Sequence, residues 1–229
     1  MVSRAEAGKF KRANDQLTHA IQRDIRKAWG ALGAYSPEGK RDALLDIVPG
    51  LVSTYGDAAA AVAMEYFETT TGARGTIHDG STPEAVQGSI RALIGGLWTG
   101  QEAEAISLVI GSATRHMLQA GRSSIYRSTR STPGLRFARV PEAGACDWCR
   151  IMSSRGAVYL SRESAGGENN KYHDDCACLA TAIRDGDELP YDAEALYAEY
   201  KPAWEAAGGT GVQAGEVARE MRRIRAAAA

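Results

Sequence analysis

The sequence predicts a mainly α-helical fold in which a helical N-terminal region precedes a small, short-stranded α+β module stapled by zinc. Apolar residues in the first 130 positions recur at helical spacing between turn-forming residues. Near residue 131 this pattern gives way to short alternating segments, and all four cysteines follow within 33 residues. We therefore expect a helical domain at 1–130, a zinc-binding module at 131–206, and a linker with a basic helical tail at 207–229.

The first two helices are predicted from apolar stripes. Residues 4–29 carry one stripe at spacings of seven, four, four and four, and Gly30 and Gly33 end that helix. Ser36, Pro37 and Glu38 are typical of the start of the next helix, whose alanine-rich continuation covers 58–71. Small side chains there would let a neighbouring helix approach closely. The residues of the first stripe are Phe10, Leu17, Ile21, Ile25 and Trp29.

Two more helices complete the predicted helical domain. Thr82 before Pro83 indicates a helix that runs to Ile94, where Gly95 and Gly96 interrupt it. The fourth helix is expected at about 101–127, with Arg115, Arg122 and Arg127 on its outer and C-terminal part. Its inward residues are expected to be Ile106, Val109, Ile110, Ala113, Met117 and Ile125.

After the turn cluster at 131–134, the module contains two alternating segments that predict strands, at 135–140 and 156–160. Residues 161–170 are expected to form a flexible loop. An acidic helix is expected at 192–206, followed by a glycine-rich linker at 208–211 and a basic helix that ends in four alanines. The inward residues of the acidic helix are expected to be Leu196, Tyr197, Tyr200 and Trp204.

Charge is balanced overall but segregated along the chain. The 229 residues carry a formal net charge of -1, so no global basic field points to nucleic acid. Residues 111–162 hold nine arginines against two acidic residues, whereas 163–205 hold eleven acidic residues against three basic ones. This pattern indicates two surfaces with different partners, one surface folded against the other, or two solvated faces of opposite sign.

No stretch of 18 or more consecutive apolar residues occurs, and the N-terminus lacks the apolar core of a signal peptide. We therefore expect no membrane partner and a reducing cytoplasm as the site of synthesis. In that compartment closely spaced cysteines are more often metal ligands than disulfides.

Five side chains are candidate metal ligands. Cys146 and Cys149 have the CxxC spacing with which one turn offers two sulfurs to a tetrahedral ion. His173, Cys176 and Cys178 follow in an HxxCxC cluster, and the connecting loop can double back at modest entropic cost. Five candidates exceed the four positions of a tetrahedral site by one.

Two ligand sets remain open. If residues 176–178 are extended, Cys176 and Cys178 point to the same side, which favours four cysteines with His173 outside the set. If His173 ligates instead, one of those two cysteines is left as a buried thiol. Either set is filled, so the Zn²⁺ would be structural. The competing interpretations are two unrelated buried cysteine pairs, or a dithiol redox site, whose CxxC usually begins a helix after a strand within an α/β pattern.

The segments 139–159 and 172–178 resemble the C-terminal module of MuF-like (phage Mu protein F-like) minor capsid proteins of tailed phages, in the form closest to that of actinobacteriophages. Members share CxxC, then Arg-Gly-x-x-Tyr, then HxxCxC, behind a long helical region. The resemblance is close over about 40 residues and architectural elsewhere. The family often has proline a few residues after the last cysteine, whereas this chain continues Leu-Ala-Thr-Ala-Ile to position 183.

The resemblance implies a phage minor capsid protein for head morphogenesis that associates with the portal vertex during procapsid assembly. The implied partners are the portal protein and the major capsid or scaffold protein. The implied locations are the virion and, during assembly, the host cytoplasm. We expect no enzymatic activity, because His116 and Ser112 share a helix face but no acid is placed to orient the histidine.

Two alternatives from other classes remain. The first is a nucleic-acid-binding zinc module that contacts packaged or ejected DNA weakly through Arg115, Arg122, Arg127 and Arg130. The second is a zinc-stapled nuclease of the HNH type. It would need a second histidine or an asparagine beside the catalytic histidine, and His173 is the only histidine in the module.

Overall fold

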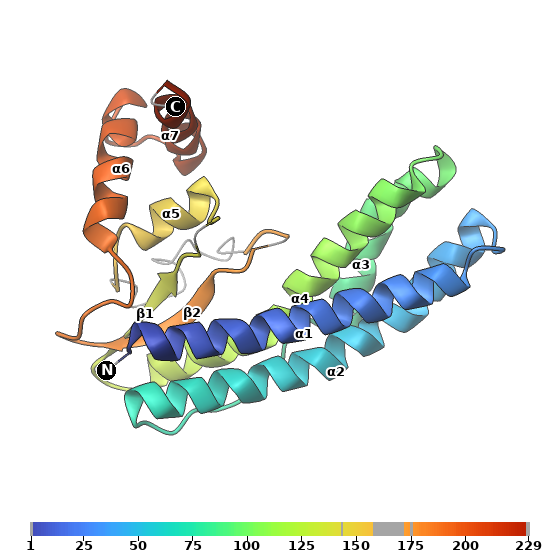
Figure 1. Ribbon diagram of the computed structural model, residues 1–229, viewed down its shortest axis with the longest axis horizontal. Coiled ribbons are helices and arrows are strands. Elements are labelled where there is room, and N and C mark those ends of the chain that lie inside the picture. The colour runs from blue at the N-terminus through green and yellow to red at the C-terminus, as the bar shows by residue number, and fades with distance from the viewer. Residues whose placement is uncertain (1, 143, 158–171, 175, 228–229) are drawn as a thin grey trace. The chain divides into compact units, whose positions relative to one another are not determined.

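The computed structural model describes residues 2–142, 144–157, 172–174 and 176–227 (Figure 1). The chain divides into two compact units. The helical unit consists of Gly8–Ser128 with Tyr172–Asp175, and the cysteine unit consists of Met1–Ala7, Thr129–Lys171 and Cys176–Ala229. The predicted fold class is confirmed, because the described residues are mainly helical with one small two-stranded sheet.

Helices α1 (Arg4–Ala31) and α2 (Pro37–Thr71) are the two longest elements of the amino-terminal half, and both were predicted. Ser36 caps α2 by accepting a hydrogen bond from the Gly39 amide, and Gly72 ends it with a left-handed φ of 68°. Figure 1 shows α1 and α2 running antiparallel. The stacked rings of Phe10 and Tyr66, with centroids 4.4 Å apart, bring the N-terminal part of α1 against the C-terminal part of α2.

Helix α2 is long and apolar enough, by length and composition alone, to cross a membrane. Core helices pass the same test, and α2 buries Leu44 and Val48 completely in the core of the helical unit. The criterion is therefore weak support for a membrane segment here.

Helix α3 (Pro83–Leu93) begins at the predicted cap, Thr82, and the predicted interruption is the short 3-10 helix η1 (Ile94–Trp98). Helix α4 (Glu102–Ser131) follows. The close approach expected of the alanine-rich part of α2 is present: a Cβ added at Gly121 of α4 would lie 2.8 Å from the carbonyl oxygen of Ala59. All six predicted inward residues of α4 are buried.

One face of α4 holds the segment between α2 and α3 in place. Ser124 and Ser128 accept hydrogen bonds from the backbone amides of His78 (2.9 Å) and Thr76 (3.0 Å). These serines stand four residues apart, the spacing that places side chains one above the other on a helix. The pattern continues towards the N-terminus of α4 with Ala120 and His116, which face Gly80 and Ser81.

The sheet of the cysteine unit pairs β1 (Leu135–Val140) antiparallel with β2 (Leu179–Arg184), in the register Leu135↔Arg184 to Val140↔Leu179. The first strand was predicted. The second was expected at 156–160 instead; of that stretch residues 158–160 lie outside the described residues, as does the expected loop at 161–170, and 156–157 are not in a strand. The run after Cys178 forms β2 because its buried residues pack along β1.

Three helices complete the cysteine unit: α5 (Asp147–Ser153), α6 (Ala193–Ala206) and α7 (Ala214–Ala227). Leu196 of α6 is buried as predicted, but Tyr197 is 50% exposed, because one residue along a helix turns the side chain by about 100°. The basic tail, as α7, buries one face on α5 and α6. The shared core contains Ile151, Ala203, Val217, Ala218 and Met221.

Candidate metal centre

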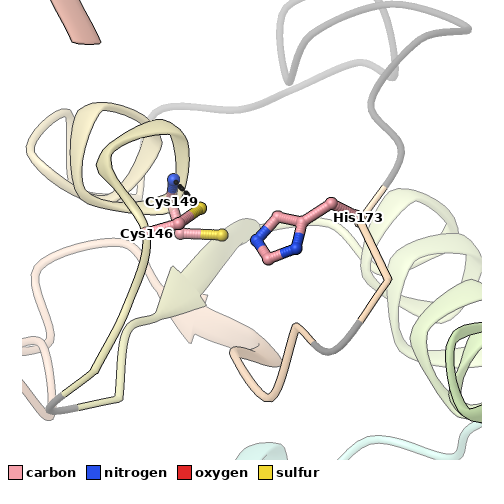
Figure 2. Close-up of side chains that lie close together, drawn as sticks. All are labelled: Cys146, Cys149 and His173. Atoms are coloured by element: carbon pink, nitrogen blue, oxygen red, sulfur yellow. Dashed lines mark hydrogen bonds between the residues drawn. The ribbon is translucent and has the colours of Figure 1, made fainter. Parts of the chain in front are cut away.

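The CxxC pair lies at the start of α5. Cys146 is the N-cap residue, and its sulfur accepts a hydrogen bond from the backbone amide of Cys149, 3.5 Å away (Figure 2). Helix α5 was not predicted from the sequence, and its place after β1 is where a redox CxxC commonly lies. The described sheet, however, is a single antiparallel pair without an α/β pattern.

Three buried sulfurs from different parts of the cysteine unit converge. The Sγ atoms of Cys149, Cys176 and Cys178 all lie within 4.8 Å of one another, and those of Cys149 and Cys176 are 3.5 Å apart. Tetrahedral zinc–thiolate bonds of about 2.3 Å require sulfurs roughly 3.8 Å apart. The three side chains are therefore spaced so that they could hold one metal ion.

Electrostatics oppose ionisation of these thiols without a cation. Hydrogen bonding to Cys176 and Cys178, together with burial, raises the pKa of Cys149 far above its ordinary value. The hydrogen bond from Cys149 lowers the pKa of Cys178, but the Cys176 hydrogen bond and burial outweigh it and raise that pKa to about 12. A divalent metal supplies the positive charge that lets such a cluster exist as thiolates.

Cys146 and His173 are the remaining predicted ligands. Cys146 is half-buried, and its sulfur lies within 4.8 Å of the Cys149 sulfur. His173, also drawn in Figure 2, belongs to the stretch Tyr172–Asp175 of the helical unit. Its Nδ1 donates to the Asp174 carbonyl oxygen at 2.6 Å, so Nε2 carries the lone pair that a metal ligand needs. Both residues remain predicted ligands.

Two of the arginines expected at a DNA surface are engaged within the helical unit. Arg115 forms an ion pair with Asp174 at 2.6 Å. Arg122 was expected on the outer face of its helix, but it is buried, with its guanidinium 3.7 Å from the centre of the Tyr172 ring. The prediction was wrong for Arg122 because the aromatic ring covers that position. Arg127 and Arg130 are exposed, as expected.

His116, the histidine considered for catalysis, contacts two serines and an arginine. His116 is buried, with Nδ1 2.6 Å from Ser81 Oγ and Nε2 2.9 Å from Ser89 Oγ. Arg115 donates to Nε2 at 3.2 Å, and because a guanidinium has only donors, Nδ1 must carry the hydrogen and donate to Ser81. In this tautomer His116 cannot take a proton from Ser81. Ser81 and His116 line a cavity of about 310 Å³.

The same histidine is held neutral. Burial, followed by the charge of Arg115, lowers the pKa of His116 to about 4, and Asp174 opposes this shift. The neutral ring can make both of its contacts, with Ser81 and Ser89. It continues the face of α4 that holds the segment between α2 and α3 in place.

Sequence reasoning missed Arg139. It is fully buried on β1, and its Nη1 lies 3.9 Å from the Cys149 sulfur. The available signal was strand alternation, because Arg139 shares a face with Leu135 and Phe137, both buried.

Comparison with known proteins gives one match. The model of the family described as VG15 protein matches residues 1–203, which covers helices α1 to α5, most of α6 and the cysteine clusters. The searches of curated proteins and of solved structures found no match. A match of this extent indicates a phage-encoded protein, and the chain belongs to the VG15 protein family.

Proposed function

We propose that this protein is a MuF-like minor capsid protein that associates with the portal vertex during procapsid assembly, and that its cysteine unit is held together by structural zinc. The convergence of three buried cysteine sulfurs within 4.8 Å carries the proposal. Membership of the VG15 family supplies the phage context.

Structural zinc suits the donor set better than a catalytic metal does. Cys149, Cys176 and Cys178 would hold the ion, and the fourth ligand would be one of the two remaining predicted ligands, Cys146 and His173. Thiolates favour zinc over hard cations such as Mg²⁺, and four protein ligands leave no position for a substrate. Bound zinc would supply folding free energy to a unit whose shared helical core is small.

Exposed aromatic residues of the helical unit offer a surface for the portal protein. Trp98 is 47% exposed and Tyr35 is 56% exposed. They lie at the same end of the unit, because the Trp98 indole donates to Glu38, which is three residues after Tyr35. Large aromatic side chains at such positions are enriched in protein interfaces.

The test is co-expression of the chain with the portal protein of the same phage, followed by affinity capture and metal analysis. We expect about one zinc per chain and capture by the portal, with capture weakened at least about tenfold in Trp98→Ala/Tyr35→Ala. The matched control is Tyr197→Ala, which removes an equally exposed aromatic side chain from the other unit. Metal-free protein would refute the zinc module, and failure of portal capture by the wild type would refute the partner.

DNA binding is the competing outcome. A duplex titrated by fluorescence anisotropy at about 0.15 M salt should bind weakly, since Arg115 and Arg122 are engaged internally. Tight binding whose affinity falls steeply with salt, and which Arg127→Ala/Arg130→Ala abolishes, would favour the nucleic-acid-binding function instead.

A further inference from the structure

Arg139 lies on the face of the sheet to which the sulfurs belong. The register pairs Arg139 with Ala180, so the two side chains point to the same side of the sheet. Cys178 is two residues before Ala180 and, if the extended backbone continues, shares that side. The α5 cysteine Cys149 approaches the same face, with its sulfur 3.9 Å from Arg139 Nη1.

A buried guanidinium at this position has a clear electrostatic consequence. Arg139 is the largest fully buried side chain among the described residues, and arginine remains charged at any pH a protein encounters. A divalent ion with three thiolates and one imidazole carries a net charge of -1, and with four thiolates a net charge of -2. In both sets the sulfurs retain excess negative charge, which a neighbouring cation stabilises.

We propose that Arg139 is a positioning residue of the metal centre: its guanidinium donates to the Cys149 thiolate and offsets the excess negative charge of the metal–thiolate cluster. The proposal rests on the metal site proposed above. It assigns Arg139 a role in metal affinity that is separate from filling space in the unit, and packing alone would not require a positive charge there.

The test compares variants of the full-length chain. Arg139→Met and Arg139→Gln remove the charge, and Arg139→Lys keeps it. Zinc affinity is measured by competition with a chromogenic chelator, and the sulfur-to-metal charge-transfer band is recorded after Co²⁺ substitution. We expect Met and Gln to weaken zinc binding about 10- to 100-fold and to shift the band, while Lys keeps most of the affinity. The matched control is Arg136→Met on the same strand, which loses only the ion pair with Asp185 at the surface.

The outcomes separate the two proposals. Wild-type protein that binds no zinc would refute the metal site itself. Wild-type protein that binds zinc, with Arg139→Gln unchanged in affinity and spectrum, would refute the role of Arg139 alone. If Arg139→Met is too unstable to isolate, the comparison of Lys with Gln decides, because a packing role predicts equal losses in both.

Discussion

Removal of the metal should unfold the cysteine unit and leave the helical unit folded. The perturbation is a strong chelator, or Cys149→Ser, which removes one of the three converging sulfurs. Structural zinc contributes about 10–16 kcal/mol in zinc-finger peptides, far above the few kcal/mol by which a small domain is stable. The cysteine unit should therefore lose its fold when the ion is removed.

The size of the expected signal follows from the helices. Helices α1 to α4 contain 28, 35, 11 and 30 residues, whereas α5, α6 and α7 contain 7, 14 and 14. The helical unit thus holds about three quarters of these α-helical residues. We expect far-ultraviolet circular dichroism at 222 nm to fall by up to about a quarter, with a separate melting transition for the remainder.

The matched control is Met152→Leu, a volume-conserving change in the same short helix that should cost less than about 1.5 kcal/mol and keep the metal. Loss of the entire helical signal in one transition would show that the two units do not fold independently. An unchanged spectrum after complete metal removal, verified by elemental analysis, would show that no metal supports the fold of the cysteine unit.

Three further predictions concern stability. Gly121→Ala should lower the free energy of unfolding, measured with urea, by about 1–3 kcal/mol, because the added Cβ would lie 2.8 Å from the α2 backbone. The control Gly50→Ala, whose Cβ would meet nothing within 4 Å, should raise it by about 0.5–1 kcal/mol. Equal effects of the two substitutions would refute the close approach of α4 to α2. The lowered pKa of His116 means that the unfolded chain binds more protons than the folded chain between about pH 4 and 6.5. The contribution of His116 to the free energy of unfolding is therefore complete above pH 6.5 and lost as the pH falls towards about 4, and it should amount to roughly 2 kcal/mol after allowance for solvent screening. An equal dependence of stability on pH in His116→Gln between these values would contradict this. Asp147→Asn should lower the free energy of unfolding by about 1–2 kcal/mol and speed tryptic cleavage of α7, since it weakens the ion pairs with Arg222 (2.8 Å) and Arg225. An unchanged rate of cleavage would show that these ion pairs do not hold α7 in place.

Local signals explain which elements were predicted well. The caps Ser36 and Thr82 each place a side-chain oxygen on the first turn of a helix, so α2 and α3 begin where the sequence indicates. The strand at 135–140 was equally readable, because it alternates and follows a turn cluster. In each case the information lies within a few consecutive residues.

Tertiary contacts explain what was missed. Nothing near Arg122 in sequence reveals that Tyr172, fifty residues later, covers its guanidinium. Nor does the local pattern reveal that the run after Cys178 pairs with β1, because the paired residues lie 39 to 49 positions apart. The short helix α5 contains a CxxC whose spacing suggested only a metal-binding turn. Such features are decided by packing partners rather than by propensity.

Arg139 involves both a local sequence pattern and a tertiary contact. A charged residue on the inward face of a strand conflicts with the hydrophobic pattern, and such conflicts are expected where a site needs them. Thiolate sulfurs beside the Arg139 guanidinium would stabilise its charge more than neutral thiols would. A bound divalent metal would in turn stabilise those thiolates, because burial and mutual contacts oppose ionisation by raising the pKa of Cys149 and Cys178. The buried arginine and the clustered cysteines therefore support the same hypothesis from opposite signs of charge: zinc binding by the wild type tests the metal site, and the affinity of Arg139→Gln for zinc tests the role of Arg139.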